Sequence, residues 1–365
     1  MEVNGKHYRT IWVSPKDEKI IKIIDQRHLP HKFKIENLKS SDDVAEAIKE
    51  MHVRGAGLIG AAAGYGMYLA SLEASKENFD SYMVNVGEKL KSTRPTAVNL
   101  SRAVEIQLDR MKQSTSHKEK IEIAFETAEE IANEDARSCE SIGKYGAGLI
   151  RKISQEKKGE RVNILTHCNA GWLAFVDYGS ALSPIYCAFN ENIPVHVFVD
   201  ITSPWNQGAK LTAWELEQQK IPYTIISDNT GGHLMQKGLV DLTIVGADRV
   251  TRRGDVVNKI GTYLKALAAY DNAIPFYVAF PTSTLDLKIK SWSEINIEER
   301  GPEEVKYATG KTKKGSIEKV LLTPENSNAL NYAFDITPAR LITGLITERG
   351  ICKANEKDVT KFFRN

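Results

Sequence analysis

The run Val162-Asn-Ile-Leu-Thr166 decides the fold, because similar short apolar runs follow it at intervals of roughly helix length. These later runs are Val195–Val199, Tyr223–Ile226, Leu242–Val245 and Phe276–Phe280. They are rich in β-branched residues and do not alternate between apolar and polar positions, which indicates strands buried on both faces of a sheet. Helical patterns separate them, as at Ala209–Lys220 and Ile260–Tyr270. Such alternation predicts an α/β fold with a Rossmann-like, doubly wound parallel sheet.

The half of the chain before this sheet has a different pattern. Short strands are expected at Arg9–Val13 and Lys19–Asp25. From Ser40, which precedes an acid by three residues as in a capping box, the pattern is helical to about residue 152. The polar run Lys157–Glu160 then marks a boundary. We therefore expect a smaller, mostly helical N-terminal domain at residues 1–155 and the Rossmann-like domain at residues 156–365.

Composition is that of an ordinary globular protein, with 42% apolar and 26% charged residues. The 49 basic and 47 acidic residues leave a net charge of +2, which favours neither nucleic acid nor an anionic membrane as a partner. The apolar stretch Ala56–Ala70 is shorter than the ~20 residues of a membrane span. The four cysteines lack CxxC spacing. The first residues do not show a basic region followed by an apolar stretch, so we do not expect a secreted protein. We expect a cytoplasmic protein with reduced thiols and no metal site.

Reactive side chains follow the predicted strands at the edge where open parallel sheets bind ligands. Cys168 follows the first strand, and Asp200, Asp228 and Asp248 follow the next three. A helix predicted shortly after Cys168 would favour its thiolate. The alternatives are an inert core thiol for Cys168 and helix caps for Asp200 and Asp228. For Asp248 the alternative is an ion pair with Arg249.

Basic residues beside predicted helix starts indicate an anion site. Arg54-Gly-Ala-Gly57 precedes a helix, Arg94-Pro-Thr96 precedes another, and Asn258-Lys259 opens a third. Two arginines, a lysine and helix N-termini suit one dianionic phosphate. Each of these residues is, taken alone, equally well explained as a solvated surface charge.

Several strings between roughly residues 8 and 350 resemble the 5-methylthioribose-1-phosphate isomerase family. They are Val53–Ala56, Arg94–Leu100, Leu165–Gly171, Gln207–Leu216, Gly246–Arg249, Asn258–Thr262 and Ile297–Arg300. The resemblance implies an aldose–ketose isomerase of methionine salvage that uses no metal or organic cofactor and works as a cytosolic homodimer. Ribose-1,5-bisphosphate isomerase and the regulatory subunits of a translation-initiation exchange factor share the fold. A non-catalytic regulatory module is therefore a competing hypothesis, although the presence of both Cys168 and Asp248 argues against it.

The resemblance also implies roles for individual residues. The catalytic pair falls on Cys168 and Asp248. The substrate contacts fall on Arg54, Gly55, Ala56, Arg94, Gln207, Asn258 and Lys259. A sugar with phosphate on C1 does not open freely, so the enzyme needs an acid at the ring oxygen and a base or relay near C2. Which residue performs which step stays open, as does the choice between an enolate and a hydride shift.

Departures from the family pattern lie around the reacting residues. Trp172 and Phe175 stand where smaller residues are usual, and Gly57-Leu58 replaces a Pro-Ala pair. We expect Trp172, Phe175 and Leu58 to determine which substituent fits at C5 of the sugar. If Trp172 points into the pocket, 5-deoxyribose 1-phosphate fits better than the methylthio sugar; otherwise Trp172 packs against the helix that it begins.

Overall fold

The computed structural model describes residues 1–95, 97–289 and 292–363. Its centre is a seven-stranded sheet in the order β18-β17-β12-β9-β6-β7-β8. The strands are β6 (Val162–Thr166), β7 (Val195–Asp200), β8 (Tyr223–Ile226), β9 (Leu242–Val245), β12 (Phe276–Ala279), β17 (Gly344–Thr347) and β18 (Gly350–Cys352). All neighbours are parallel except β17 and β18. Numbered along the chain, the six parallel strands lie in the order 3-2-1-4-5-6, which confirms the predicted doubly wound sheet.

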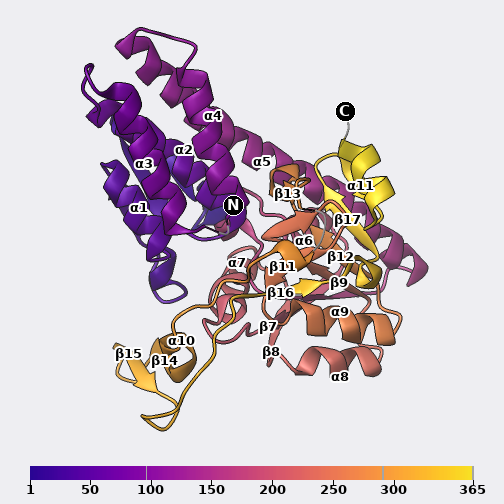
Figure 1. Ribbon diagram of the computed structural model, residues 1–365. Coiled ribbons are helices and arrows are strands. Elements are labelled where there is room, and N and C mark those ends of the chain that lie inside the picture. The colour runs from indigo at the N-terminus through magenta and orange to yellow at the C-terminus, as the bar shows by residue number, and fades with distance from the viewer. Residues whose placement is uncertain (96, 290–291, 364–365) are drawn as a thin grey trace.

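Helices cover both faces of this sheet, as the strand composition predicts (Figure 1). On one face Ile150, Ile185 and Leu216 pack against strand residues such as Val197. Their helices are α5 (His117–Glu156), α6 (Ser183–Asn190) and α7 (Ala213–Gln218). On the other face lie α8 (Thr230–Gln236), α9 (Thr262–Asp271) and α11 (Glu356–Phe363), which contribute to a second apolar cluster. Burial on both sides explains why the strands show no alternation.

The N-terminal part combines an antiparallel sheet with a group of helices. The sheet contains β3 (Ile11–Ser14), β4 (Asp17–Ile24) and β5 (Ile35–Leu38), and a two-stranded ribbon, β1 (Glu2–Val3) and β2 (Lys6–His7), precedes it. The helices are α1 (Ser41–Lys49), α2 (Ala56–Glu73), α3 (Phe79–Thr93) and α4 (Val98–Met111). The predicted capping box is confirmed, since Ser40 and Asp43 bond reciprocally at the start of α1. No helix within the described ranges is long and apolar enough to cross a membrane.

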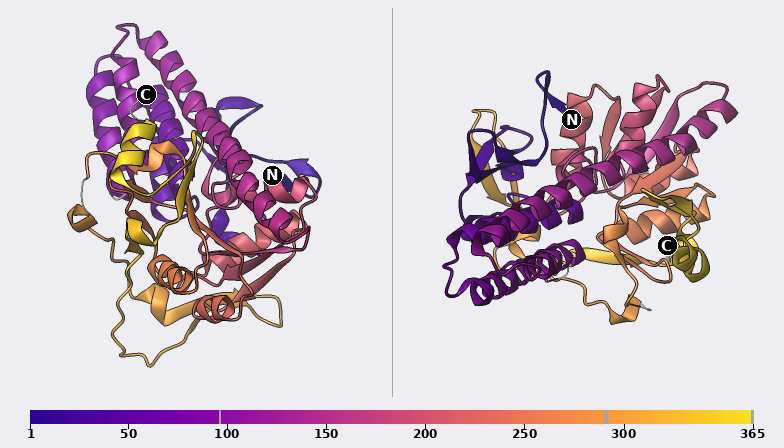
Figure 2. Two further views of the ribbon diagram at one scale, coloured as in Figure 1. Left: turned by 90° about the vertical axis from the view of Figure 1, so that its right-hand side faces the viewer. Right: turned by 90° about the horizontal axis from the view of Figure 1, so that it is seen from above.

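Helix α5 is 40 residues long and belongs to both parts of the molecule. Ala124 and Ala132 pack in the cluster of N-terminal helices, whereas Ile142 and Ile150 pack beneath the central sheet. Figure 2 shows the helix running from one group of elements to the other. The domain boundary predicted after residue 155 falls in the last turn of α5 and stays a prediction.

A second, four-stranded sheet lies beside the central one in the order β13-β10-β11-β16. Its strands are β10 (Arg249–Thr251), β11 (Val256–Lys259), β13 (Leu285–Asp286) and β16 (Phe334–Thr337). The expectation that Asn258-Lys259 opens a helix is wrong, because both residues end strand β11 and α9 begins at Thr262. A hairpin of β14 (Tyr307–Lys311) and β15 (Ile317–Leu321) follows α10 (Glu303–Lys306) and projects from the body (Figure 1).

Candidate active site

Cys168 and Asp248 flank the point where the strand order of the central sheet reverses. Cys168 follows β6 and Asp248 follows β9, and these two strands are neighbours. Doubly wound sheets bind ligands at this position, because the chain leaves the two strands toward opposite faces. Both residues line a pocket of about 570 Å³. The remaining lining residues are Met51, Arg54, Gly55, Arg94, Pro204, Trp205, Gln207, Lys259, Ile260, Arg300, Glu304, Asn331, Tyr332 and Phe334.

The backbone of Cys168 is held in an unusual conformation. Its φ angle is 64°, in the left-handed region that non-glycine residues rarely adopt. The Cys168 N–H donates to Thr202 Oγ1 at 2.8 Å, and its carbonyl oxygen accepts from Thr212 Oγ1 at 2.6 Å. These bonds to two neighbouring segments fix the direction in which the thiol points.

The prediction that a helix N-terminus activates the Cys168 thiol is wrong. A short 3-10 turn at Trp172–Ala174 follows, and the next α-helix begins at Ser183. Burial raises the pKa of Cys168, against the opposing charges of Arg54 and Lys259. Cys168 is therefore a protonated thiol near neutral pH.

Asp248 has a similar electrostatic environment. Burial raises the pKa of its carboxyl group, while the positive charges of Lys259, Arg54 and Arg94 oppose the shift. A protonated Asp248 can donate a proton, which a carboxylate of ordinary pKa cannot do near neutral pH.

The backbone of Asp248 belongs to the junction between the two sheets. Asp248 lies directly before strand β10, and its N–H donates to the carbonyl oxygen of Val257 on strand β11 at 2.9 Å. Arg249, the alternative ion-pair partner of Asp248, has its Nη1 atom 3.8 Å from Asp286 Oδ2.

Basic side chains converge on the same pocket. Both terminal nitrogens of Arg54 donate to Asn169, at 2.7 Å each, and Lys259 Nζ lies 4.7 Å from the centre of the Phe334 ring. Burial lowers the pKa of Lys259 and of Arg94. Arg94 lies 3.8 Å from Glu298, and Thr96 of its string lies outside the described residues. The predicted phosphate ligands are thus brought together from both parts of the chain.

Two buried polar atoms in this pocket have no hydrogen-bond partner among the described residues. They are Arg94 Nε, a donor, and Gln207 Oε1, an acceptor. Buried polar atoms are normally paired, so such atoms at a pocket wall indicate a ligand that supplies the missing partners. An anionic oxygen suits Arg94, and a hydroxyl group suits Gln207.

An apolar compartment of about 500 Å³ adjoins the polar pocket. Asp248, Gly55, Arg94 and Phe334 line both compartments. The other walls of the apolar compartment are Ala56, Ile59, Ala97, Arg249, Val257, Ile295, Asn296 and Ile297. No local pattern predicts this compartment, because its walls come from distant segments. Ile297 does lie in one of the strings that carry the family resemblance. That string was the only indication in the sequence that Ile297 lies near the site.

The three predicted specificity residues lie elsewhere. Trp172, Phe175 and Leu58 are buried, and none of them is among the residues lining either compartment. Trp172 stacks on Trp214, with 6.3 Å between the ring centres, because the turn that it begins folds back against α7. Trp172 therefore does not point into the pocket, and it does not shorten the space for the substituent at C5 of the sugar.

The remaining predicted residues differ in their exposure to the two compartments. Ala56 lines the apolar one, whereas Asn258 is buried beside Lys259 and donates to Thr262 Oγ1 at 3.0 Å. Asp228 does not line the polar pocket and accepts bonds from the N–H groups of Thr202 and Ser203. Asp228 therefore shapes the loop that holds Cys168.

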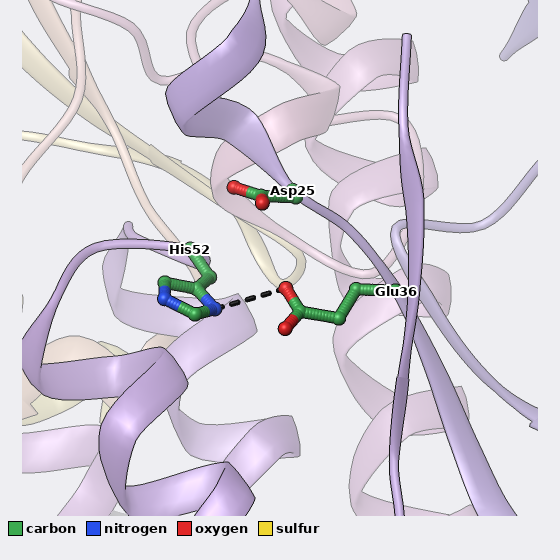
Figure 3. A group of neighbouring side chains, drawn as sticks. All are labelled: Asp25, Glu36 and His52. Atoms are coloured by element: carbon green, nitrogen blue, oxygen red, sulfur yellow. Dashed lines mark hydrogen bonds and ion pairs between the residues drawn. The ribbon is translucent and has the colours of Figure 1, made fainter.

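Asp25, Glu36 and His52 form a separate group of titratable side chains (Figure 3). His52 lies two residues before Arg54 in the chain. His52 Nδ1 lies 2.9 Å from Glu36 Oε2. Their potential metal-ligand atoms lie within 4.8 Å of one another. Basic side chains already surround Asp25, namely Arg27, His28 and Lys34. We assign this group to holding the turn at Met51–Arg54.

Comparison with known proteins decides the family. The sequence model of the Initiation factor 2 subunit family matches residues 52–354. A methylthioribose-1-phosphate isomerase of Desulfatibacillum aliphaticivorans is 52% identical over 100% of this chain and 99% of its own. The chain belongs to this family, on its methylthioribose-1-phosphate isomerase branch.

Solved structures of this family have the same fold. A 5-methylthioribose 1-phosphate isomerase from Pyrococcus horikoshii superposes with a TM-score of 0.84 at 38% identity, over 98% of this chain and 96% of its own. The translation initiation factor eIF-2B, subunit delta, from A. fulgidus gives 0.81 at 37% identity, over 98% and 100%. Isomerases and translation initiation factor subunits, the two classes of protein that the resemblance implied, thus share this fold.

Proposed function

We propose that this protein isomerises 5-methylthioribose 1-phosphate to 5-methylthioribulose 1-phosphate, an aldose–ketose conversion in methionine salvage. The observation that carries the proposal is the joining of a basic pocket and an apolar compartment at Asp248. The substrate has the same two-sided character, with a dianionic phosphate on C1 and an apolar methylthio group on C5. The full-length relatives that bear this name support the same reaction.

The phosphate is placed in the basic pocket, with Arg54, Arg94 and Lys259 as its ligands. A dianion compensates the cost of burying several like charges, and the depressed pKa of Lys259 reflects that cost. Gln207 is placed on a sugar hydroxyl through its unpartnered oxygen. The C5 substituent then extends into the apolar compartment, past Asp248.

Asp248 is proposed as the acid that opens the ring. Its proton passes to the ring oxygen as the bond from that oxygen to C1 breaks, which leaves C1 electron-poor. A hydrogen then moves from C2 to C1, and the C2 hydroxyl loses its proton to become the ketone. Burial raises the pKa of the Cys168 thiol, so the thiol carries a proton that it can pass on. Cys168 is proposed as the relay near C2, which takes up the proton of the C2 hydroxyl as it passes its own proton to the Asp248 carboxylate and so restores the acid.

Two alternatives are less well supported. The case for 5-deoxyribose 1-phosphate depended on Trp172 shortening the pocket, and Trp172 packs against Trp214 instead. A regulatory module without catalysis has no need for a raised-pKa acid beside a buried thiol at the wall of one pocket.

The decisive experiment is an assay of the purified protein with both sugar phosphates. We expect turnover of the methylthio sugar to exceed that of the deoxy sugar. Substrate deuterated at C2 then separates the two routes, because a hydride shift retains the label at C1 and an enolate exchanges it with solvent. Failure to convert either sugar would refute the isomerase.

Three further properties are part of the proposal through the family resemblance. The protein is expected to work as a homodimer in the cytoplasm, without a metal or organic cofactor. Its near-neutral net charge of +2 gives no reason to expect nucleic acid or membrane as a partner. Sedimentation at micromolar concentration tests the dimer directly.

A further inference from the structure

His167 precedes Cys168 and is buried at the end of β6, with 1% of its surface exposed. Its two ring nitrogens meet different parts of the molecule. Nδ1 lies 2.8 Å from Asp200 Oδ2 at the end of β7, and Nε2 lies 2.8 Å from the carbonyl oxygen of Ile260. The ring therefore connects the loop of Cys168 with the residue that follows Lys259.

Both partners of the His167 ring are hydrogen-bond acceptors. A carbonyl oxygen only accepts, so Nε2 must carry a proton. Asp200 Oδ2 also lies 3.1 Å from Lys265 Nζ. Contacts at both ring nitrogens therefore fix the orientation of the imidazole.

We propose that His167 acts as a positioning residue, which clamps the Lys259 segment to the Cys168 loop. The inference rests on the proposed function, since it assigns His167 a role in aligning that site. The ring faces Asp200 on β7, and Lys265 of α9 completes the buried group.

Two further acids face this buried group from other elements. Asp228, after β8, has a carboxylate oxygen within 4.8 Å of the ligand atoms of His167 and Asp200, and its backbone oxygen accepts from Lys265 Nζ. Burial raises the pKa of Asp335 on β16, and the N–H groups of Gly261 and Tyr263 oppose this shift. Three acids and one lysine thus surround the ring.

The turn at Gly261 leaves room for the His167 ring because glycine has no Cβ atom. Gly261 has a φ angle of 102°, and a Cβ atom there would lie 2.9 Å from His167 Cε1. Asp335 accepts the N–H of Gly261 at 2.7 Å and of Tyr263 at 3.1 Å. The turn between Lys259 and α9 is thus fixed by His167 on one side and Asp335 on the other. A displaced turn moves Lys259 relative to Cys168.

The hydrogen bond between the ring and the Ile260 carbonyl is tested on the wild-type protein, without any assay of activity. In protein labelled with nitrogen-15 at histidine, we expect Nε2 of His167 to carry a proton, because its partner only accepts. An Nε2 without a proton would overturn the clamp, whether or not the isomerase proposal holds.

The positioning role is tested by His167→Asn and His167→Gln, each of which retains one donor. We expect kcat/KM to fall about 10–100-fold in folded protein, as for a reacting group displaced by about an ångström. In the Lys259→Ala background the same substitutions should cost less than about twofold, because the clamp acts through Lys259. Equal losses in both backgrounds would refute positioning. His196→Asn is the matched control, since His196 lies on β7 and bonds to Thr224 Oγ1.

Discussion

The guanidinium group of Arg54 donates hydrogen bonds to both the side chain and the backbone of Asn169. Nη1 donates to Asn169 Oδ1 and Nη2 to Asn169 O, each at 2.7 Å. Asn169 directly follows Cys168, and its amide also donates to Glu215 Oε1 at 2.8 Å. A residue before α2 is thereby tied to the loop that carries the thiol. The proposed phosphate ligand and the proposed catalytic cysteine cannot move independently.

Cys168→Ser and Asp248→Asn should each lower kcat about 10²–10⁴-fold, the usual effect of removing a proton-transfer group. Both substitutions nearly preserve volume, so the melting temperature should change little. Steady-state assays and thermal unfolding measure the two effects. Wild-type turnover in either variant would remove that residue from the catalytic pair.

The pH dependence follows from the raised pKa of Asp248. The group is protonated below its folded-state pKa and loses its proton as pH rises through that value. If Asp248 is the acid, kcat/KM is constant at low pH and falls as pH increases. A profile of kcat/KM from pH 5 to pH 9 measures this. A rise of kcat/KM across the same range would mean that Asp248 works as a base.

Lys259→Ala and Arg94→Ala should raise KM about 10–100-fold, since a hydrogen bond to a charged group contributes about 1.5–3 kcal/mol. Arg54→Ala should lower kcat as well, because it also releases Asn169. Initial-rate kinetics separate the two parameters. An unchanged KM in all three variants would contradict the phosphate site.

Trp172→Ala should destabilise the fold by about 3–5 kcal/mol, as for a large aromatic residue lost from a core. The ratio of kcat/KM for the methylthio and deoxy sugars should stay the same. Ile297→Ala enlarges the apolar compartment instead and should change that ratio. Unfolding by urea and paired assays measure these effects. The opposite pattern would return Trp172 to the specificity site.

Gly57→Ala should destabilise the protein by about 1–3 kcal/mol through overpacking. An added Cβ would lie 2.1 Å from Asp135 Oδ1 and 2.4 Å from Phe175 Cδ1. Phe175→Leu in the same chain should recover part of the loss, and unfolding by urea measures each step. Gly148→Ala is the control, because nothing lies within 4 Å of its Cβ position. Equal effects of the two alanine substitutions would contradict the close packing.

The features that sequence predicted are those that depend on local patterns. Five of the seven strands of the central sheet follow from continuous apolar runs, whereas β17 and β18 were not predicted. The rule on strand ends led to Cys168 and Asp248. The second sheet was missed because strands as short as Leu285–Asp286 have no pattern of their own. The apolar compartment was missed because Ile59 and Ile297 meet only after folding. The orientation of Trp172 depends on Trp214, which is distant along the chain.

Helix α5 has a consequence for how the molecule unfolds. One uninterrupted ladder of backbone hydrogen bonds joins the N-terminal cluster to the underside of the central sheet. Fraying at either end removes apolar partners from the other elements packed on the helix, so the loss spreads in both directions. The two halves should melt in a single transition. A fragment that begins after residue 155 would lack the part of α5 that covers its sheet. We therefore expect that the two halves of the polypeptide cannot be separated into independently folding pieces.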